Sequence, residues 1–457
     1  MRARPHPAAA LARTLRAATR YAAIASALLP AALSAAPAPA ATGDAITIPI
    51  PGITPAEGEP PGASPIDEAP PPPGQPPAAN TYVLFAAEQL THDDNLYRLP
   101  TGADLSALAS PHATRADLID SVSAGTDLHW SQSQQTVNLH VRLDDNRYDD
   151  NDNLDNTSTQ DDLAWNWRLG ERLSGDAGAS YYRALTNFAG IDYDALDMVG
   201  RTDWYASARY RLGAPWTLFG GLDGAHTTLS AAPESIYDFH STSTIAGLEF
   251  SSPSGNALSA EYRNTSARFP QVFVLNGQPF NSNYDENTAL ATLKYALTAA
   301  TELQADAGYL RRTYPASAFA AFSGSIAHVS LDWQPSAALE VVLAGRHELK
   351  AYVDSEADYF VSNGATLEPG WKPAPALTLS VAFSYESHDY LGTSPSALTY
   401  AARRDTVVTQ EARLTYTPAP FITAALAYQY VRRDSNHTVL EFDDAIATAN
   451  ITVKCRL

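Results

Sequence analysis

From residue 81 to its end, the chain repeatedly alternates apolar and polar residues. Residues 137–144 read VNLHVRLD, and residues 377–386 read LTLSVAFSYE. Successive side chains on a β-strand point to opposite faces, so each stretch of this kind has one apolar and one polar face. The pattern predicts an all-β protein whose strands separate an apolar environment from a polar one.

The breaks between these stretches alternate between short and long. Short breaks fall at residues 131–134, 213–215, 251–255, 298–300, 334–336 and 417–420, and long polar stretches at 144–160, 266–286, 387–404 and 432–443. Short periplasmic turns and long extracellular loops are typical of outer-membrane barrels. We therefore expect a closed transmembrane β-barrel of about 18 antiparallel strands at residues 81–457, because lipid offers no partner for an open sheet edge.

Aromatic residues support this orientation, because they gather near the ends of the expected strands on the apolar parity. One set accompanies the short turns: Trp130, Trp167, Tyr210, Trp216, Phe250, Tyr295, Trp333 and Tyr416. A second set lies toward the long loops: Tyr181, Tyr262, Tyr309, Tyr385 and Tyr430. Two aromatic girdles on the outer face are expected where a barrel meets the two membrane interfaces.

The first 80 residues have a different composition. Residues 1–40 combine five arginines, an apolar stretch at 21–33 and the small-residue run Ala38-Pro39-Ala40, which predicts a cleavable signal peptide. Residues 41–80 contain twelve prolines and no Lys or Arg, and composition of this kind predicts a disordered periplasmic segment. This segment is expected either to bind a periplasmic or inner-membrane partner or to act as a simple tether.

Loss of the signal peptide leaves 25 basic and 50 acidic residues, a formal charge of −25. Such a charge argues against binding to nucleic acid or to anionic lipid. Asp149, Asp150 and Asp152 lie in the expected loop 144–160 and could bind Ca²⁺ or join lipopolysaccharide bridged by divalent cations. The simpler alternative is a hydrated, soluble loop, because no complete Ca²⁺-binding motif follows. No other cofactor is expected.

Signals for catalysis are weak. The chain has no nucleophile-elbow, zinc-protease or phosphate-loop motif. His328, Ser330 and His347 are close in sequence, but a catalytic triad would require His347 to reach the other two from a different strand. We interpret the three as ordinary lumen and loop residues and expect no enzymatic activity.

The polar parity of the strands predicts a lumen lined by charges of both signs. The basic residues are Arg142, Arg168, Arg183, Arg209, Arg211, Arg263, Lys294, Arg346 and Arg413, and the acidic ones are Asp144, Asp223, Glu261, Asp306, Asp332, Glu340, Glu386 and Glu411. The simplest interpretation is that most of them pair across neighbouring strands. A barrel of this size leaves an aqueous channel unless a loop or plug fills it.

Three aromatic residues on successive strands also occupy positions of the alternation that face the lumen: Tyr182, Tyr205 and Phe219. Counting from the short turns places the two tyrosines at similar height, near Arg183 and Arg209. Aromatic planes pack on sugar rings and Arg donates to hydroxyl or carboxylate groups, so this patch is a candidate path for a sugar chain. Alternatively, the rings cover a folded-in loop or the space at Gly220, Gly221 and Gly224.

Four segments resemble the EpsL family of outer-membrane proteins, which accompany exopolysaccharide, exosortase and PEP-CTERM gene clusters. They read DDNLYRLP at residues 93–100, HWSQ at 129–132, DNRY at 145–148 and LAWNW at 163–167. The resemblance covers the whole expected barrel and implies a channel or assembly component for exopolysaccharide export, with the polymer and its synthesis proteins as partners. Two alternatives remain open: a general or sugar-uptake diffusion porin, and a non-conducting structural component of a secretion complex.

Overall fold

The structure is a computed structural model that describes residues 80–457, apart from residues 106–112, 187, 189–195, 232–233, 276–277, 316–320, 352–358 and 393–401. The expected signal peptide at 1–40 and all but the last residue of the proline-rich segment at 41–80 lie outside the described residues.

Eighteen of the described strands form one antiparallel sheet. In the first half of the barrel they are β1 (Thr81–Asp93), β2 (Asp117–Gln132), β3 (Gln135–Tyr148), β4 (Asn156–Leu169), β5 (Leu173–Leu185), β6 (Met198–Gly213), β7 (Trp216–Leu229), β8 (Phe239–Ser251) and β9 (Ala257–Arg268). In the second half they are β12 (Tyr284–Thr298), β13 (Thr301–Thr313), β14 (Phe322–Ser336), β15 (Leu339–Ala351), β16 (Tyr359–Ala374), β17 (Leu377–Leu391), β18 (Arg404–Ala419), β19 (Ile422–Ser435) and β20 (Phe442–Arg456).

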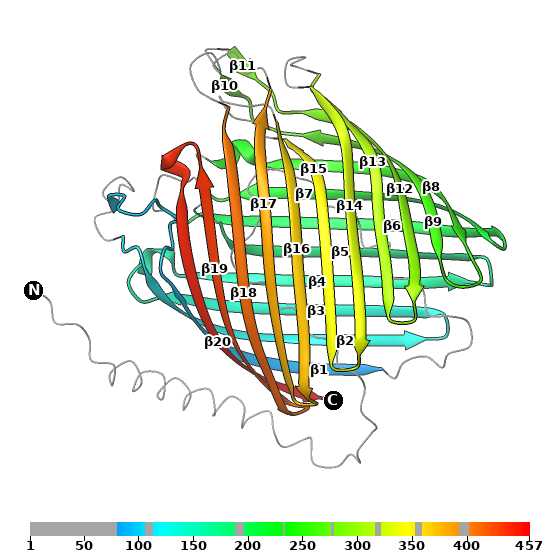
Figure 1. The fold of residues 1–457 in the computed structure, drawn as a ribbon, viewed down its shortest axis with the longest axis horizontal. Coiled ribbons are helices and arrows are strands. Elements are labelled where there is room, and N and C mark those ends of the chain that lie inside the picture. Colours follow the sequence, from blue (N-terminus) through cyan, green and yellow to red (C-terminus); the bar gives the residue numbers. More distant parts are fainter. Residues whose placement is uncertain are drawn as a thin grey trace, which may run out of the picture. The chain divides into compact units, whose positions relative to one another are not determined.

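Each strand pairs with the barrel strands before and after it in sequence, and the sheet closes on itself (Figure 1). Closure is made by β1 and β20, which pair from Val83 opposite Arg456 to Asp93 opposite Ile446. The predicted fold class is therefore confirmed: the described chain is a closed, 18-stranded antiparallel β-barrel.

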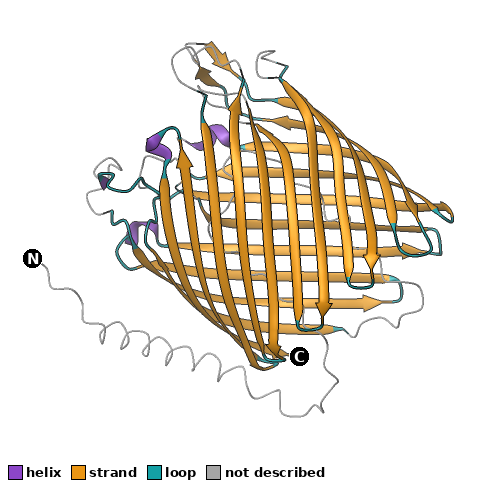
Figure 2. Ribbon diagram, in the orientation of Figure 1, coloured by secondary structure: helices purple, strands orange, loops and turns teal. Residues whose placement is uncertain are grey.

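Smaller elements lie in the longer connections. The strands β10 (Phe273–Leu275) and β11 (Gln278–Phe280) form a separate hairpin between β9 and β12. The short 3-10 helices η3 (Asp152–Leu154), η4 (Glu234–Tyr237) and η6 (Thr438–Leu440) lie in other connections, among the purple segments of Figure 2. Among the described residues, no helix is both long and apolar enough to cross a membrane.

The connections between strands differ sharply at the two ends of the barrel. Eight turns of two to five residues define what we call the short-turn rim, and they occupy residues 133–134, 170–172, 214–215, 252–256, 299–300, 337–338, 375–376 and 420–421. The opposite end, the long-loop rim, carries connections such as 94–116 and 269–283. Six of the short turns lie at or next to predicted breaks, whereas the turns at 170–172 and 375–376 were not predicted.

Three prolines near the short-turn rim mark bulges rather than turns. The pairing register shifts between Trp333 and Ser336, between Trp371 and Ala374, and between Tyr416 and Ala419. Each interval contains a proline. Proline has no N–H to donate to the ladder, so the pairing breaks there, and the chain turns only a few residues later.

The long polar stretches were predicted as loops, and this was only partly right. β3 continues to Tyr148 and β4 begins at Asn156, so the connection within residues 144–160 is only 149–155. The barrel strands contain 12 to 16 residues, more than the ~9–11 needed to cross a bilayer. Polar residues on both faces therefore mark where a strand leaves the membrane, and not where it ends.

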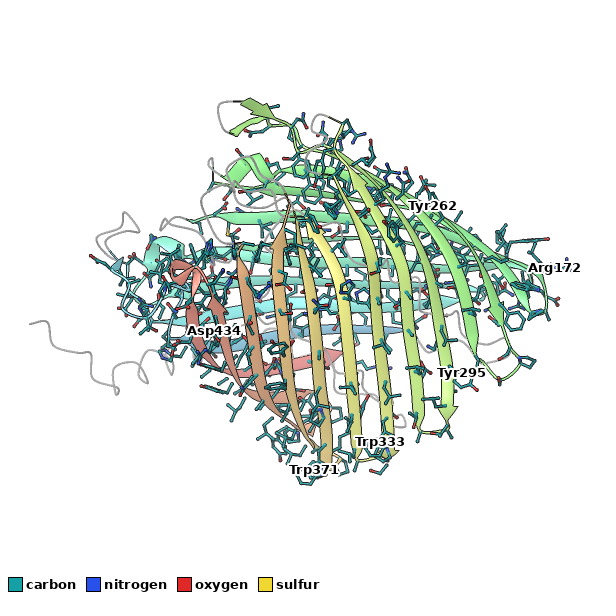
Figure 3. All side chains as sticks on the ribbon, turned by 45° about the horizontal axis from the view of Figure 1, so that its top comes forward. Arg172, Tyr262, Tyr295, Trp333, Trp371 and Asp434 are labelled. Carbon is teal, nitrogen blue, oxygen red and sulfur yellow. The ribbon has the colours of Figure 1, made fainter. Side chains whose placement is uncertain are left out.

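The outer face of the barrel is apolar and carries the predicted aromatic residues. Figure 3 shows the predicted Tyr295 and Trp333 near the short-turn rim, together with Trp371, which was not predicted; the predicted Tyr262 lies farther toward the long-loop rim. All four side chains are about half exposed, as expected for rings that face lipid. Most of the other predicted girdle residues are similarly exposed, although Trp167 lies against the outer surface at Gly175.

At the long-loop rim, connections pack against each other and against the inner face. Leu96 and Tyr97 of the first long connection form a cluster with Leu154 and Phe188 from the next two. The Tyr97 and Phe188 rings have centroids 4.9 Å apart. Tyr97 is almost fully buried, so this part of the first connection is fixed in place by apolar packing.

Candidate functional site in the barrel interior

The pairing register shows which side chains share the inner face. Paired residues lie on the same face of a sheet, so the exposed outer residues Trp165 and Trp204 fix the orientation of β4 to β6. The same argument extends around the closed sheet. The inner face of the described strands is rich in charged, hydroxyl and amide side chains, as expected for a barrel that encloses water.

Most of the predicted lumen charges lie in ion pairs on this wall. Arg263 contacts Asp223 at 2.8 Å and Glu261 at 3.4 Å, which links β9 to β7. Arg209 reaches Glu249 at 3.1 Å across β7. Other pairs are Arg142 with Asp144 at 2.8 Å, Lys294 with Glu302 at 3.2 Å, and Arg413 with Glu411 at 3.1 Å. The pairs neutralise much of the charge. The pairs of Arg209, Arg263 and Lys294 also link different strands, whereas Arg142–Asp144 and Arg413–Glu411 each lie within one strand.

Arg168 and Arg211 also lie on the inner face, near the short-turn rim, but Arg183 does not. Arg183 pairs with Thr159 and Gly200 on the outer parity, and its side chain is exposed. Its inclusion among the lumen residues was wrong. Adjacent residues of a strand point to opposite faces, so Arg183 cannot share the inner face with Tyr182.

Two of the three aromatic residues proposed as a sugar path, Tyr205 and Phe219, lie over glycines of the wall. A Cβ at Gly178 would stand 2.6 Å from the Tyr205 ring, and one at Gly247 would overlap the Phe219 ring. Rings therefore cover glycines, as the alternative interpretation predicted. The glycines that Tyr205 and Phe219 cover are Gly178 and Gly247, and not Gly220, Gly221 or Gly224. Gly224 is covered by Trp204 on the outer face.

The pairing register shows that Tyr182 and Tyr205 do not lie at similar height, as had been predicted. Tyr182 lies opposite Arg201, whereas Tyr205 lies opposite Gly178. They are thus four residues apart along the strands, about 13 Å at 3.3 Å per residue. Counting from the short turns had placed them level because it ignored the stagger between strands. The two rings do not form a single patch with Arg209, which lies over Phe219 instead.

The acidic loop 149–155 is organised by a carboxylate outside it. Asp117 accepts hydrogen bonds from the backbone N–H groups of Asp149, Asp150 and Asn151 at 3.0, 3.1 and 2.9 Å. Burial, and the nearby charges of Asp117 and Asp149, raise the pKa of Asp150. Within the described part of the chain, no group of three His, Cys, Asp or Glu residues has the arrangement of a metal site.

The residues weighed as a catalytic triad are separated by the wall. His328 and Ser330 share the inner face of β14, whereas His347 has the outer parity of β15 and contacts Asn363 at 2.7 Å. His328 instead contacts Glu348 at 2.7 Å. The three therefore do not come together as nucleophile and base.

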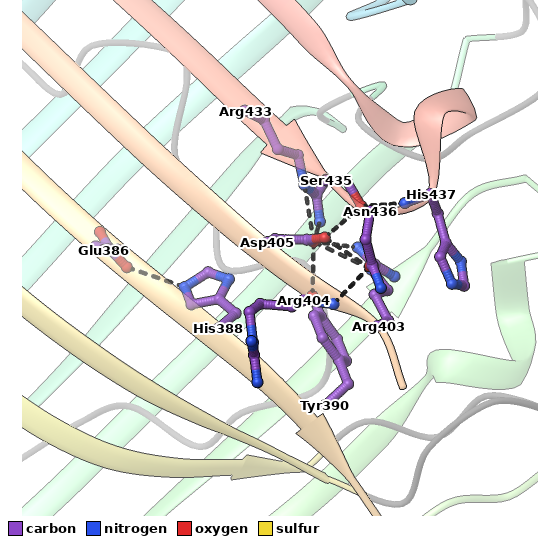
Figure 4. Close-up of polar contacts among 10 residues, drawn as sticks. All are labelled: Glu386, His388, Tyr390, Arg403, Arg404, Asp405, Arg433, Ser435, Asn436 and His437. Carbon is purple, nitrogen blue, oxygen red and sulfur yellow. Dashed lines mark hydrogen bonds and ion pairs between the residues drawn. The ribbon is translucent and has the colours of Figure 1, made fainter. Parts of the chain in front are cut away.

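Near the long-loop rim, the structure contains a buried carboxylate centre that sequence analysis missed. Figure 4 shows Asp405 of β18 between Arg403 and Arg433. Asp405 is fully buried and accepts hydrogen bonds from both guanidinium groups, from the Ser435 hydroxyl at 2.6 Å and from the Tyr390 hydroxyl at 3.2 Å. Arg433 comes from β19 and Tyr390 from β17, so this centre ties three strands together.

Residues 93–100, the longest of the four segments that carry the family resemblance, help to fold the first long connection. Asn95 donates from Nδ2 to the carbonyl oxygens of Leu99 and Asp443 at 2.9 and 2.7 Å, and its Oδ1 accepts from Arg115 at 2.9 Å. Arg98 has a positive φ of 50° and forms an ion pair with Asp444 of β20 at 3.4 Å. The side chains of residues 93–100 thus hold the first long connection against the rim.

Comparison with known proteins gives a partial answer on family. Residues 282–455, which contain β12 to β19 and all but the last residue of β20, match the family model described as "Putative beta-barrel porin 2". The match covers nine of the eighteen barrel strands. No curated protein matches the chain in sequence. The matched family is that of a β-barrel porin, and it does not bear specifically on the exopolysaccharide family.

Some solved structures of outer-membrane porins are weakly similar to this chain. The outer-membrane protein opdK from Pseudomonas aeruginosa has 11% identity and a TM-score of 0.44, covering 82% of this chain and 99% of that one. A BenF-like porin from Pseudomonas fluorescens Pf-5 has 12% identity and a TM-score of 0.46, covering 83% and 99%. Similarity at this level does not bear on function. The closed register, the apolar outer face and the family match together describe a porin-like outer-membrane β-barrel.

Proposed function

We propose that the chain forms a passive channel through which small hydrophilic solutes cross the outer membrane. The observation that carries this proposal is the contrast between the two faces of one closed sheet. The outer face exposes aromatic and aliphatic side chains, whereas the inner face presents charged, hydroxyl and amide groups. An inner face of this kind is solvated by water, and barrels of 16–18 strands have room for an aqueous channel.

The charges of the wall favour a channel of modest ion selectivity. Arg209, Arg263 and Arg413 each have an acidic partner within 3.1 Å, so little net charge of one sign faces the lumen at these points. A wall that is neutralised pair by pair attracts neither anions nor cations strongly. Solutes are then expected to be selected chiefly by size and by hydrogen bonding.

An exopolysaccharide cargo remains a prediction that rests on the four segments resembling the EpsL family, the longest of which is residues 93–100. In the structure, those residues fold the first long connection, so they support no assignment of cargo. The porin family match supports the diffusion-channel alternative instead. Deletion of the gene separates the two, since loss of surface polymer with intact precursor synthesis would favour export.

The direct test is conductance of the purified protein in planar bilayers. A passive channel should give ohmic, stepwise currents in KCl, with similar permeability for K⁺ and Cl⁻. Addition of neutral polymers of increasing size should restore the full current above a sharp size limit. Protein that is folded by heat-modifiable mobility but gives no current would contradict the proposal and favour a non-conducting structural role.

A further inference from the structure

We propose that the inner wall at β13 to β16 contains a binding subsite for an uncharged, hydroxyl-rich solute of monosaccharide size. The inference rests on the proposed channel function and specifies the solute class. A pocket of about 240 Å³ lies on this wall, with Gln304, Asp306, His328, Ser330, Arg346 and Thr366 among its lining residues. Water occupies a site once about 10–15 Å³ is open to its centre, so this volume holds many waters and has room for one sugar ring.

The register explains how these residues meet. Asp306, His328, Arg346 and Gly364 pair successively across the four strands and form one row. Gln304, Ser330, Ala344 and Thr366 form the next row toward the short-turn rim. Both rows lie on the inner face, so eight positions from four strands surround one volume.

The pocket exists because two positions in these rows lack bulk. Ala344 and Gly364 stand between long polar neighbours, and the Arg346 side chain extends over Gly364. A Cβ at Gly364 would stand 2.8 Å from Nε of Arg346. A larger residue at either position would fill the space or displace the arginine.

The basic groups of the pocket are already engaged by acidic partners. His328 contacts Glu348 at 2.7 Å, and Arg346 forms an ion pair with Glu386 of β17. Lys350 also contacts Glu348, at 3.3 Å. The positive charge is therefore balanced within the wall, which disfavours a site for an anionic solute.

The remaining polar groups are available to a ligand. Among the described residues, no hydrogen bond or ion pair is made by the Asp306 carboxylate, the Ser330 hydroxyl or the Gln304 amide. All three side chains are half-buried, so part of their hydration is already lost. A carboxylate, an amide and hydroxyls in one recess offer acceptors and donors at the spacing of a polyol, and a neutral hydroxyl-rich solute uses both.

The test measures block of the channel current by sugars, with the full-length protein in planar bilayers. In the wild type, glucose should reduce the current at lower concentration than glucuronate, which meets the Asp306 charge. Ala344→Leu, which fills the pocket, should raise the glucose concentration for half-block by about tenfold or more. Asp306→Asn, which removes the charged acceptor, should raise it about three- to tenfold.

Two matched variants act as controls on the same inner face. Ala427→Leu adds the same bulk on β19, and Asp332→Asn removes an aspartate charge from β14 outside the pocket. Both should leave the glucose concentration for half-block within about twofold of wild type. Equal glucose block in all four variants, with normal conductance, would overturn the subsite. Stronger block by glucuronate than by glucose would overturn the solute class.

Failure of the channel proposal would be seen separately, as absence of current from the wild type without any sugar. In that case, equilibrium dialysis of labelled glucose against the detergent-solubilised protein replaces current block. Binding that is lost in Ala344→Leu and kept in Ala427→Leu would support the subsite, and equal binding by both would overturn it.

Discussion

Asp306 and Asp405 are both inward-facing aspartates, yet their surroundings are opposite. Asp405, near the long-loop rim, is fully buried and receives hydrogen bonds from two arginines, a serine and a tyrosine. Asp306, farther down the wall, is half-buried and makes no hydrogen bond with a described residue. The alternation along a strand therefore tells which face a charged side chain takes. Its neighbours on the adjacent strands decide whether that side chain stabilises the wall or can bind a solute.

The sharpest test of this contrast is truncation of each aspartate. Asp405→Ala should lower the free energy of unfolding by about 3–5 kcal/mol, because it leaves the buried Arg403 and the largely buried Arg433 without their acceptor. Asp306→Ala should change it by less than about 0.5 kcal/mol. Urea unfolding in detergent, followed by heat-modifiable mobility, measures both. Equal losses would mean that the two carboxylates are equally structural.

Glycines under aromatic rings give the next largest effect. Gly247→Ala places a Cβ against the Phe219 ring and should cost about 1–3 kcal/mol of stability. Gly370→Ala is the matched control, because the nearest atom to its Cβ is 4.0 Å away. In a double-mutant cycle with Phe219→Ala, the loss caused by the new Cβ should be smaller, although the Ala260 carbonyl oxygen, 2.7 Å from it, keeps part of the loss. Additive effects in that cycle would show that ring and glycine do not interact.

The first long connection provides a smaller effect on stability and a larger one on local order. Asn95→Ala removes hydrogen bonds to Leu99, Asp443 and Arg115, and should cost about 1–3 kcal/mol. Limited proteolysis should then cleave within residues 94–116 faster than in wild type, while the barrel strands stay protected. Unchanged cleavage would mean that the apolar cluster around Tyr97 fixes this connection alone.

Arg183→Ala should have the smallest effect. Its side chain is exposed on the outer parity of β5, so its loss should change stability by less than about 0.5 kcal/mol and leave conductance unchanged. Arg209→Ala, on the inner face, removes the partner of Glu249 and should shift selectivity toward cations. A selectivity change caused by Arg183→Ala would contradict its assignment to the outer face.

The barrel fold could be predicted because the sequence pattern that indicates it involves only residues close together in the chain. Alternation and turn spacing depend on neighbouring residues, and these gave the fold class, the strand number and most inner-face charges. The error at Arg183 arose from assigning two adjacent residues to one face. The height error for Tyr182 and Tyr205 arose from stagger, which depends on pairing between strands and leaves no local pattern.

The interior sites were not predictable for the same reason. Asp405 and Arg433 are 28 residues apart in sequence, and Asp306 and Arg346 are 40 apart, so only the register brings their neighbours together. The glycines under rings carried a weak signal, since an isolated glycine in a strand indicates close approach of another group. The sequence does not say which ring approaches.

Rings resting on glycines have a consequence for how this sequence can change over time. On the inner face, Phe85 covers Gly125, Tyr205 covers Gly178 and Phe219 covers Gly247, and on the outer face Trp204 covers Gly224. Neither member of a pair can be replaced freely, since a side chain at the glycine meets the ring and a smaller residue leaves backbone uncovered. Among related barrels, the two positions of each pair are expected to vary together, although they are 20 to 40 residues apart.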